Sequence, residues 1–552
     1  MKFKVIQLDT LKSFVKSPTF IILAISLAIL ALQIAFVGKY RPFNSDDLYW
    51  QQAVQTWRPF SGNMFYFGTH DIFVALGPFF AIFEYLFEPS RKLLILETFL
   101  LTSLTFVLCY ASALYFMAKL KVKATYVTLL PFAWLASFGY PLVQNYLNSD
   151  WRTFQIGFSF ATFAIVAAYL NGDIQPFRHL KSKVLTGIGI AIVALLMYGD
   201  PYFTYFTLGP LAVFVAALFL LKKITRASLL VLYAGIAISL VASKAWEALF
   251  DAAGIYVMAE VPSQFVNFDN IVTNIVASLH GMLIIFNADF FGRETTNPAT
   301  VGFIVNAILL GVVLYKTYGL RHNFKPNYIK QNKLTLSQLW IAFLALTMAF
   351  IFAVYTSSSL VQVTNYRFFI MFIYCSVVLL CLVLATTKNR YLQLTVCSLL
   401  LVGTVFNVAY TTLTDSVRSR AEVAVNVGNS VNYDILDNLR AEGLTKGYST
   451  YWQGNVNTYF SGNTIAFLPS ICGADGKTTQ FPWLMDGGQF QKKATESFYI
   501  HDPDILAPAS CKLEEVEAQF GVPKKTKIVS NKIILIYDYD ISEKILENQP
   551  KH

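Results

Sequence analysis

Long runs of apolar residues alternate with short polar segments along most of the chain. A bilayer core about 30 Å thick needs roughly 20 apolar residues per helix, and residues 18–413 contain about eleven runs of this kind. The first run, residues 18–37, is longer than the apolar stretch of a secretory signal and follows four lysines, Lys2, Lys4, Lys12 and Lys16. The pattern predicts an α-helical polytopic membrane protein whose first span is an uncleaved anchor.

Two further apolar stretches, residues 72–87 and 271–286, are marginal in length for a span. The first contains Pro78 and Glu84, and the second contains Asn274 and His280. Counting either stretch as a span would move the later Lys-rich connections to the opposite side of the membrane. We therefore expect two helices that lie at or dip into the outer interface. His280 fits a packed or interfacial histidine better than a catalytic base.

Basic and acidic residues alternate from one connection to the next. The basic connections hold Lys119, Lys121, Lys123, Arg178, Lys181, Lys183, Lys222, Lys223, Arg226, Lys316, Arg321, Lys325, Lys330, Lys333, Lys388 and Arg390. The other connections hold Asp46, Asp47, Asp71, Asp150, Asp200, Asp251, Glu260, Asp269, Asp289 and Glu294. Since basic loops stay in the cytoplasm, the pattern predicts a multi-pass protein of the cell membrane with a cytoplasmic N-terminus and an acidic exoplasmic face.

Composition supports the membrane class. Of 552 residues, 55% are hydrophobic and only 14% are charged, and the mean hydropathy is +0.50. A soluble domain of this size would carry more charge. The net charge of +10 does not indicate a nucleic-acid partner, because the basic residues fall in short clusters between apolar runs.

The composition becomes that of a water-soluble domain from Asp415 onward. We expect a transmembrane domain over residues 1–413, with a first exoplasmic loop at 39–92, and a small exoplasmic α/β domain over 414–552. The tail pattern predicts a helix at 433–442 and strands at 448–452, 464–468, 497–500 and 532–537.

The six cysteines divide between these two regions. Cys109, Cys375, Cys381 and Cys397 lie in apolar runs, where small packing residues are common. Cys472 and Cys511 lie in the tail, where a bridge and two separate thiols are both open. The sequence contains no CxxC pair and no phosphate-binding loop of the Walker type, so it gives no support to nucleotide-driven chemistry.

The most distinctive polar motif is Asn44-Ser45-Asp46-Asp47-Leu48-Tyr49-Trp50, just after the first span. A carboxylate at the membrane surface can accept a proton from a hydroxyl nucleophile, while a second carboxylate orients it or holds Mg²⁺ or Mn²⁺. The same residues also fit the N-cap of a short interfacial helix. Both interpretations stay open from spacing alone.

With His70-Asp71-Ile72-Phe73 further along the same loop, this motif resembles the GT-C fold of integral membrane glycosyltransferases, here of bacterial type. The tail segment Gly447-Tyr448-Ser449-Thr450-Tyr451-Trp452 is similar to segments of bacterial polytopic transferase-like proteins. The resemblance implies a polyprenyl-phosphate sugar donor, a glycan, lipid or protein acceptor, and exoplasmic hexosyl or pentosyl transfer. It implies that Asp46 or Asp47 is the general base, with Asp46 preferred.

The resemblance also implies further site residues. Asp150 is the candidate for a second acid in a later exoplasmic loop, and His70 and Asp71 are expected to contact substrate. Arg367 is the first candidate for binding the donor phosphate, with Arg152 and Arg293 behind it, although each could equally contact lipid headgroups. Asp200 fits either acceptor binding or an Asp-Pro turn. Aromatic rings that could stack on sugars, but that are also typical of membrane interfaces, are Tyr49, Trp50, Trp57, Tyr66 and Trp151.

Two other classes of function compete with the enzyme. A transporter or flippase of polyprenyl-linked glycans would carry ionisable residues inside the membrane, and Glu97 in the second span is the clearest example. A non-catalytic scaffold that displays its tail would not need the acids of the outer face. An inverting glycosyltransferase accounts for more of the observed pattern than either alternative.

Overall fold

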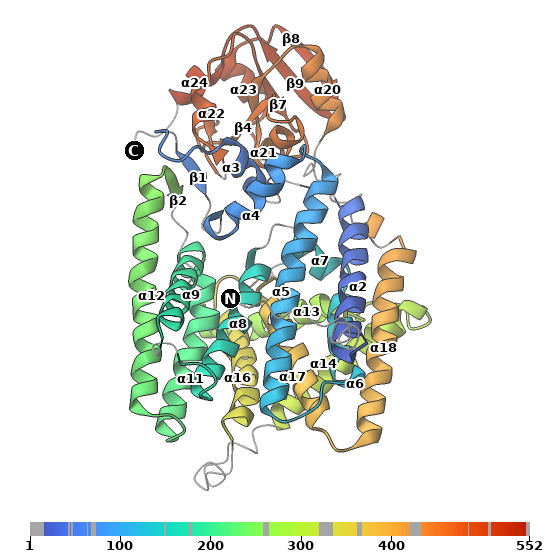
Figure 1. Cartoon of the computed structure of the whole chain (residues 1–552). Helices are drawn as coiled ribbons and strands as arrows, with labels where there is room; N and C mark the ends of the chain where they lie inside the picture. Colours follow the sequence, from blue (N-terminus) through green and yellow to red (C-terminus); the bar gives the residue numbers. More distant parts are fainter. Residues whose placement is uncertain are drawn as a thin grey trace.

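The computed structural model describes residues 16–41, 43, 45, 48–62, 64–67, 73–147, 151–175, 179–257, 264–319, 335–361, 367–415, 417–419, 432–483, 485–505 and 509–547. A helical bundle occupies most of the molecule, and a small domain with a β-sheet lies on one end of it (Figure 1). The chain is therefore a mostly helical protein, as the apolar pattern predicts.

Ten helices among the described residues are long and apolar enough to cross a membrane. They are α2 (Pro18–Tyr40), α5 (Arg91–Lys119), α8 (Trp151–Leu170), α9 (Leu180–Gly199), α12 (Arg226–Ala252), α13 (Phe268–Ile285), α14 (Pro298–Gly319), α16 (Leu336–Thr356), α17 (Ile370–Thr386) and α18 (Arg390–Leu413). The architecture is that of a polytopic membrane protein.

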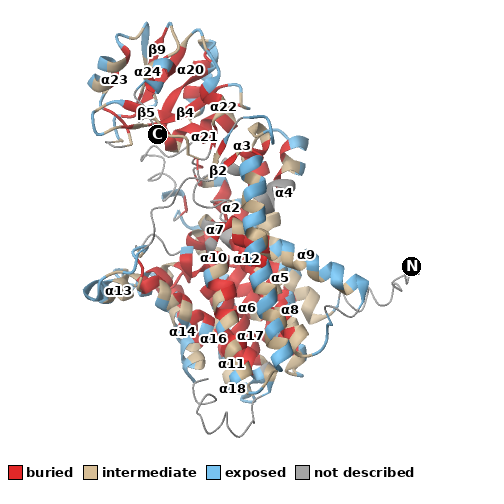
Figure 2. Cartoon of the chain, turned by 90° about the vertical axis from the view of Figure 1, so that its left-hand side faces the viewer, coloured by how far each residue is buried: buried red, intermediate tan, exposed pale blue. Residues whose placement is uncertain are grey.

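The number ten differs from the expected eleven because of three segments. Two runs are interrupted: one forms α6 (Tyr126–Ala136) and α7 (Tyr140–Leu147), and the other forms α10 (Pro201–Phe203), η2 (Thr204–Leu208) and α11 (Gly209–Leu220). The helix α13 passes the criterion of length and composition but extends sideways from the bundle (Figure 2). Eleven spans result if both interrupted runs cross and α13 lies at the interface.

The helix α17 lies in the middle of the bundle. Nearly all of its side chains are buried, whereas α9 and α12 expose most of theirs (Figure 2). The bundle thus has a densely packed centre around α17 and a more open flank formed by α9 and α12.

A buried polar network joins several helices inside the bundle. The Asn407 Oδ1 atom accepts hydrogen bonds of 2.8 Å from Asn306 Nδ2 and from Asn287 Nδ2, and Asn407 Nδ2 donates to Ser137 Oγ at 3.2 Å. The indole Nε1 of Trp134 donates to Asn306 Oδ1 at 2.8 Å. These residues come from α6, α14, α18 and the turns after α6 and α13, so the network fixes their mutual register.

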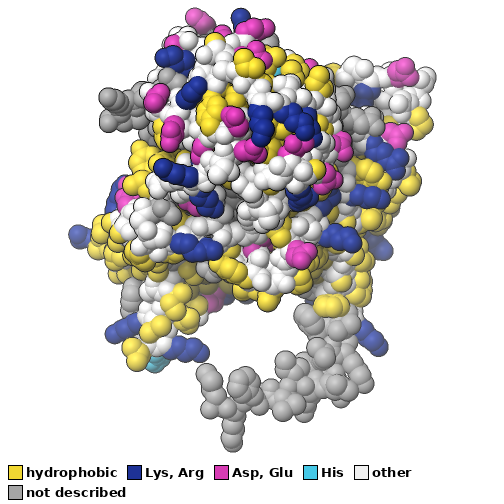
Figure 3. All heavy atoms as spheres, turned by 90° about the horizontal axis from the view of Figure 1, so that it is seen from above, with side chains coloured by type: hydrophobic (Ala, Val, Ile, Leu, Met, Phe, Trp, Pro, Cys, Tyr) yellow, Lys and Arg dark blue, Asp and Glu magenta, His cyan; other side chains and the backbone are white. Residues whose placement is uncertain are grey.

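The described basic turns lie at the end of the bundle that is far from the tail. This end holds the connections α5 to α6, α11 to α12 and α17 to α18 (Figure 1), which carry Lys119, Lys121, Lys123, Lys222, Lys223, Arg226, Lys388 and Arg390. On the other end, the tail surface mixes basic and acidic side chains (Figure 3). The described basic turns of the bundle therefore gather at one end of it.

The tail folds as an α/β unit with a six-stranded sheet in the order β5-β4-β3-β7-β9-β8. The strands are β3 (Lys446–Thr450), β4 (Ala466–Cys472), β5 (Thr478–Gln480), β7 (Ser497–His501), β8 (Lys525–Val529) and β9 (Lys532–Tyr537). The helices are α20 (Tyr433–Ala441), α21 (Tyr451–Phe460), α22 (Gly488–Gln491), α23 (Leu513–Phe520) and α24 (Ser542–Leu546). Strand β3 pairs in parallel with both β4 and β7.

The expected tail elements mostly recur, with one informative difference. The helix and the strands expected near 433, 497 and 532 are present, but Tyr451 and Trp452 begin α21 instead of continuing a strand. Parallel strands need a crossover connection, and α21 supplies it between β3 and β4. Cys472 and Cys511 form a disulfide, which joins the last residue of β4 to the segment just before α23.

We expect Asn407→Leu to destabilise the bundle, because it leaves the buried amide groups of Asn287 and Asn306 without their shared acceptor. The cost should be about 1 to 3 kcal/mol, seen as a lower thermal midpoint of the purified protein. Val405→Leu, on the exposed face of the same helix, is the control and should leave the midpoint unchanged. An unchanged midpoint in Asn407→Leu would contradict a structural role for the network.

Candidate functional site

The first loop lies between the bundle and the tail. It contains α3 (Tyr49–Thr56), β1 (Phe65–Phe67) and α4 (Phe73–Leu86), which Figure 1 shows stacked beneath the tail sheet. A three-stranded sheet in the order β2-β1-β6 joins three distant segments, since β2 (Ile255–Val257) follows α12 and β6 (Met485–Asp486) belongs to the tail. We call this contact region of loop and tail the outer junction.

Ser45 attaches the acidic motif to the tail. Its Oγ donates to the backbone carbonyl of Tyr451 at 2.5 Å and accepts the backbone N–H of Asn455 at 3.1 Å, both in α21. Ser45 and Leu48 are fully buried. The two described residues that bracket Asp46 and Asp47 are therefore held at the outer junction.

Several residues expected to form the site lie outside the described residues: Asp46, Asp47, His70, Asp71 and Asp150. Tyr49 and Trp50 belong to the first turn of α3, and Trp151 and Arg152 to that of α8, but only their backbone is described. The structure thus places the elements that carry these residues and leaves their side-chain roles as expectations.

Four partly exposed or buried rings lie beside the Ser45 anchor. Tyr451 contacts Trp452 and Phe481 at centroid distances of 5.1 and 5.7 Å, and Phe481 stacks on Trp483 at 5.9 Å. Tyr451 is buried, whereas Trp452, Phe481 and Trp483 keep part of their surface exposed. Tyr451 and Trp452 belong to the segment that resembles bacterial transferase-like proteins, whereas Phe481 and Trp483 were not expected from the sequence.

Two arginines lie at the start of the first loop. The guanidinium groups of Arg41 and Arg91 lie 5.9 and 4.9 Å from the ring centroid of Phe43. Arg91 also donates to the carbonyls of Gly38 at 2.9 Å and Arg41 at 2.6 Å, so it caps the end of α2. Arg41 lies three residues before Asn44 in the sequence, whereas Arg91 comes from the far end of the loop and approaches the motif through Phe43. Neither arginine is among the site residues expected from the sequence.

A buried pair of carboxyl groups, Glu84 of α4 and Glu97 of α5, is the main feature of the outer junction. Tyr459 Oη of α21 donates to Glu84 Oε1 at 2.9 Å, and Gln55 Nε2 of α3 donates to Glu84 Oε2 at 2.6 Å. Gln51 Nε2, one turn before Gln55, donates to Glu97 Oε2 at 2.9 Å. The first loop, the span α5 and the tail therefore meet at these two acids. Glu84 is 6% exposed and Glu97 is 1% exposed.

Burial changes the acidity of the groups that meet at Glu84. Burial is the largest cause that raises the pKa of Glu84, to about 7. Burial and the facing Glu84 raise the pKa of Tyr459 well above its usual value, so its hydroxyl stays a donor.

Asp200 and Arg367 lie on neighbouring turns. Asp200 is buried, and its Oδ1 accepts the backbone N–H of Tyr202 at 2.8 Å, which is the turn role considered for this residue. Tyr202 Oη donates to the carbonyl of Phe368 at 3.3 Å, next to Arg367. The exposed Arg367 guanidinium lies 5.7 Å from the Phe368 ring.

Arg293 occupies a separate position between α13 and α14. Its Nε donates to the carbonyl of Asp289 at 2.7 Å, and its guanidinium lies 3.8 Å from the ring centroid of Phe303. His280 Nε2 lies 3.4 Å from Asp289 Oδ2, which fits its expected interfacial role. These contacts of Arg293 with the described residues are local.

One group of three potential metal ligands occurs in the described part of the chain: Cys472, Cys511 and Glu515. The disulfide uses both sulfur atoms, so this group is a covalent bridge beside a carboxylate. Sequence reasoning noticed Glu97 inside an apolar run and Glu84 inside an interfacial helix. It could not pair them, because the partners Gln51 and Tyr459 are 46 and 375 residues away from Glu97 and Glu84, respectively.

Comparison with models of known protein families, with curated proteins and with solved structures finds no match to this chain. The fold and the outer junction therefore define a class, a polytopic helical membrane protein with an α/β tail.

The raised pKa of Glu84 predicts a pH-dependent stability. The folded protein holds this proton up to about pH 7, whereas the unfolded carboxyl releases it near 4.5, so the free energy of unfolding should fall as pH rises through that window. In Glu84→Gln, the decrease in the free energy of unfolding over this pH range should be smaller than in wild type, by on the order of 2 kcal/mol. Thermal midpoints between pH 4.5 and 8 measure the difference from wild type.

Glu88→Gln is the matched control, because Glu88 is an exposed acid in the same loop. If both Glu84→Gln and Glu88→Gln show the same dependence of the thermal midpoint on pH as wild type, Glu84 does not hold the buried proton.

Proposed function

We propose that this protein is a membrane glycosyltransferase of GT-C type. It moves a sugar from a polyprenyl-phosphate donor to an acceptor hydroxyl on the exoplasmic face, with inversion. The observation that carries the proposal is the attachment of Ser45 to α21, because it holds the acidic motif where the first loop meets the tail. A base on a mobile loop would not be positioned for proton transfer.

In the proposed reaction, Asp46 or Asp47 takes the proton of the acceptor hydroxyl. The acceptor oxygen forms a bond to the anomeric carbon, and the bond from that carbon to the phosphate oxygen breaks with inversion. The departing polyprenyl phosphate gains negative charge, which Arg367 neutralises. Arg41 and Arg91 supply further positive charge near the acidic motif. The proposed steps use no metal ion.

The rings of Trp452, Phe481 and Trp483 support sugar binding beside the acidic motif. Flat aromatic faces bind the apolar faces of sugar rings, and part of each ring is exposed. Since Tyr451 contacts both Ser45 and this cluster, we assign acceptor binding to the tail. Asp200 and Tyr202 then position the turn that carries Arg367.

The decisive assay uses purified protein in lipid vesicles with polyprenyl-phosphate sugars and a panel of acceptors. We expect Asp46→Asn or Asp47→Asn to lower the transfer rate about 10²- to 10⁴-fold, while Asp475→Asn, an exposed tail acid, keeps the full rate. Ser45→Ala should lower kcat more than it changes KM, because it loosens the motif without removing a reacting group. Full transfer by both motif variants, with their fold intact, would end the proposal.

The proposed topology gives a separate prediction. A cysteine at position 522, where Val522 is 93% exposed in the tail, should react with an impermeant maleimide in intact cells. A cysteine that replaces Lys222, in the basic turn between α11 and α12, should react only after permeabilisation. The reverse pattern would move every candidate residue to the cytoplasm.

A second candidate function is a proton-coupled transporter of a polyprenyl-linked glycan, favoured by the buried Glu84 and Glu97 pair. Glu97 lies six residues after Arg91, about 9 Å along α5, so it is close to the outer end of its helix. A transporter would lose proton-coupled flux in Glu97→Gln and would keep it in Asp46→Asn. If the protein is a transferase, Asp46→Asn should lose sugar transfer and Glu97→Gln should keep it.

A further inference from the structure

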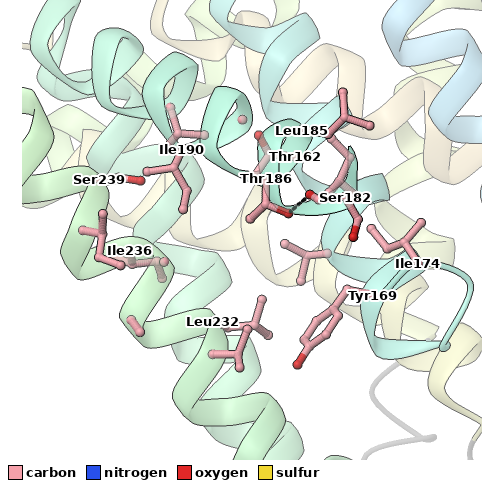
Figure 4. Close-up of a pocket in the computed structure, with 18 of the residues that line it drawn as sticks. Thr162, Tyr169, Ile174, Ser182, Leu185, Thr186, Ile190, Leu232, Ile236 and Ser239 are labelled. Atoms are coloured by element: carbon pink, nitrogen blue, oxygen red, sulfur yellow. Dashed lines mark hydrogen bonds between the residues drawn. The ribbon is translucent and has the colours of Figure 1, made fainter. Parts of the chain in front are cut away.

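A large cavity lies in the flank of the bundle, between α8, α9, α11 and α12 (Figure 4). Its volume is about 980 Å³. Lining residues such as Ile165, Leu185 and Ile238 are more than half exposed, so the cavity opens toward the surroundings of the bundle. None of the described residues of the outer junction lines it.

The walls of the cavity are mostly aliphatic. Figure 4 shows Ile190 of α9 and Leu232 and Ile236 of α12 around it, with the hydroxyl groups of Ser182 and Thr186 toward one end. Among the described residues that line it, Asp173 is the one acid, and it accepts from Lys119 Nζ at 2.5 Å and from Tyr115 Oη at 2.9 Å. The interior therefore suits a hydrocarbon chain.

The length of the cavity matches one leaflet. Its lining runs along α9 from Ser182 to Val193, about 16 Å at 1.5 Å per residue. Half of a hydrocarbon core of about 30 Å is about 15 Å. The residues of α9 that line the cavity belong to the N-terminal part of this helix, which begins at the basic end of the bundle.

Basic residues occur near the helix starts at the polar end of the cavity. The helices α9 and α12, which pack against each other, both begin at this end, so both direct their N-terminal dipoles toward it. His179 lines the cavity directly. The basic residues near these two helix starts are Lys181, Lys183, Lys222, Lys223 and Arg226. Because Lys119 compensates Asp173, this end favours an anionic headgroup.

We propose that the cavity binds an anionic glycerophospholipid of the cytoplasmic leaflet, with an acyl chain between α9 and α12 and the phosphate at the basic helix starts. This site goes beyond the proposed transferase activity and does not depend on it. The bound lipid fills a space that the protein's own side chains leave open, and it joins the open flank to the packed centre of the bundle.

Glycines provide the sharpest test. A Cβ atom added at Gly235 or Gly189, which line the cavity, meets no atom within 4 Å, and the same holds for Gly187, which does not line it. Gly235→Phe and Gly189→Phe should therefore fill the cavity without a clash. Gly187→Phe is the matched control on the same helix as Gly189. Circular dichroism and the thermal midpoint check that each variant folds.

The measurement is native mass spectrometry of the delipidated full chain, titrated with phosphatidylglycerol or phosphatidylcholine of identical acyl chains. We expect wild type and Gly187→Phe to bind phosphatidylglycerol at least tenfold more tightly than phosphatidylcholine. The filled variants should lose this binding at least tenfold. The triple variant Lys181→Gln, Lys183→Gln and Arg226→Gln should lose the preference for phosphatidylglycerol and keep the binding of phosphatidylcholine.

Four results would overturn the proposal. Phosphatidylglycerol binding that survives in both filled variants would place the lipid elsewhere, and equal binding of the two lipids would remove the role of the basic end. Preferential binding of polyprenyl phosphate, or a mass of two protein copies without lipid, would assign the cavity to a different occupant. Loss of lipid binding with full sugar transfer would leave the proposed function intact.

Discussion

The pairing of polar groups in the buried interior organises the bundle. Where water is excluded, amide and hydroxyl groups are stabilised by partners within the protein. Hydroxyl side chains such as Thr162, Ser376 and Thr404 donate to carbonyls one turn back in their own helices. The amides of Asn287, Asn306 and Asn407 cannot do this, and they pair with one another across helices. The register of the bundle follows from these pairings.

The same requirement explains the outer junction. Glu84 and Glu97 are removed from water where α4 and α5 meet, and side-chain donors from α3 and α21 pair with them. Docking of the tail supplies Tyr459 as one of these donors, and Ser45 forms a second connection between the loop and α21. The acids thus attach the tail to the membrane domain, and they hold the segment that carries the proposed base.

The two ends of the bundle have different chemistry. The end below the tail collects acids, aromatic rings and a few arginines, which suits a reaction between a sugar and a lipid phosphate. The opposite end collects lysines and helix N-termini around an apolar cavity, which suits the anchoring of a lipid. A protein that spans a membrane can assign separate tasks to its two faces because the apolar layer prevents charged groups from exchanging between them.

Much of this organisation could be predicted from the sequence, because hydropathy and the distribution of Lys and Arg act through local composition. The apolar runs correspond to the long helices, the last of which, α18, ends at Leu413, two residues before the change in composition at Asp415. The tail strands near 497 and 532 also follow from their own alternation. Only the tertiary structure decided which distant residues meet: Ser45 with Tyr451, Glu84 with Tyr459, and Cys472 with Cys511. Hydropathy carries no information about such pairs, since their energy comes from contacts between segments far apart in the chain. For the same reason Tyr451 and Trp452 form a helix: the parallel pairing of β3 and β4, and not local β propensity, requires a crossover there.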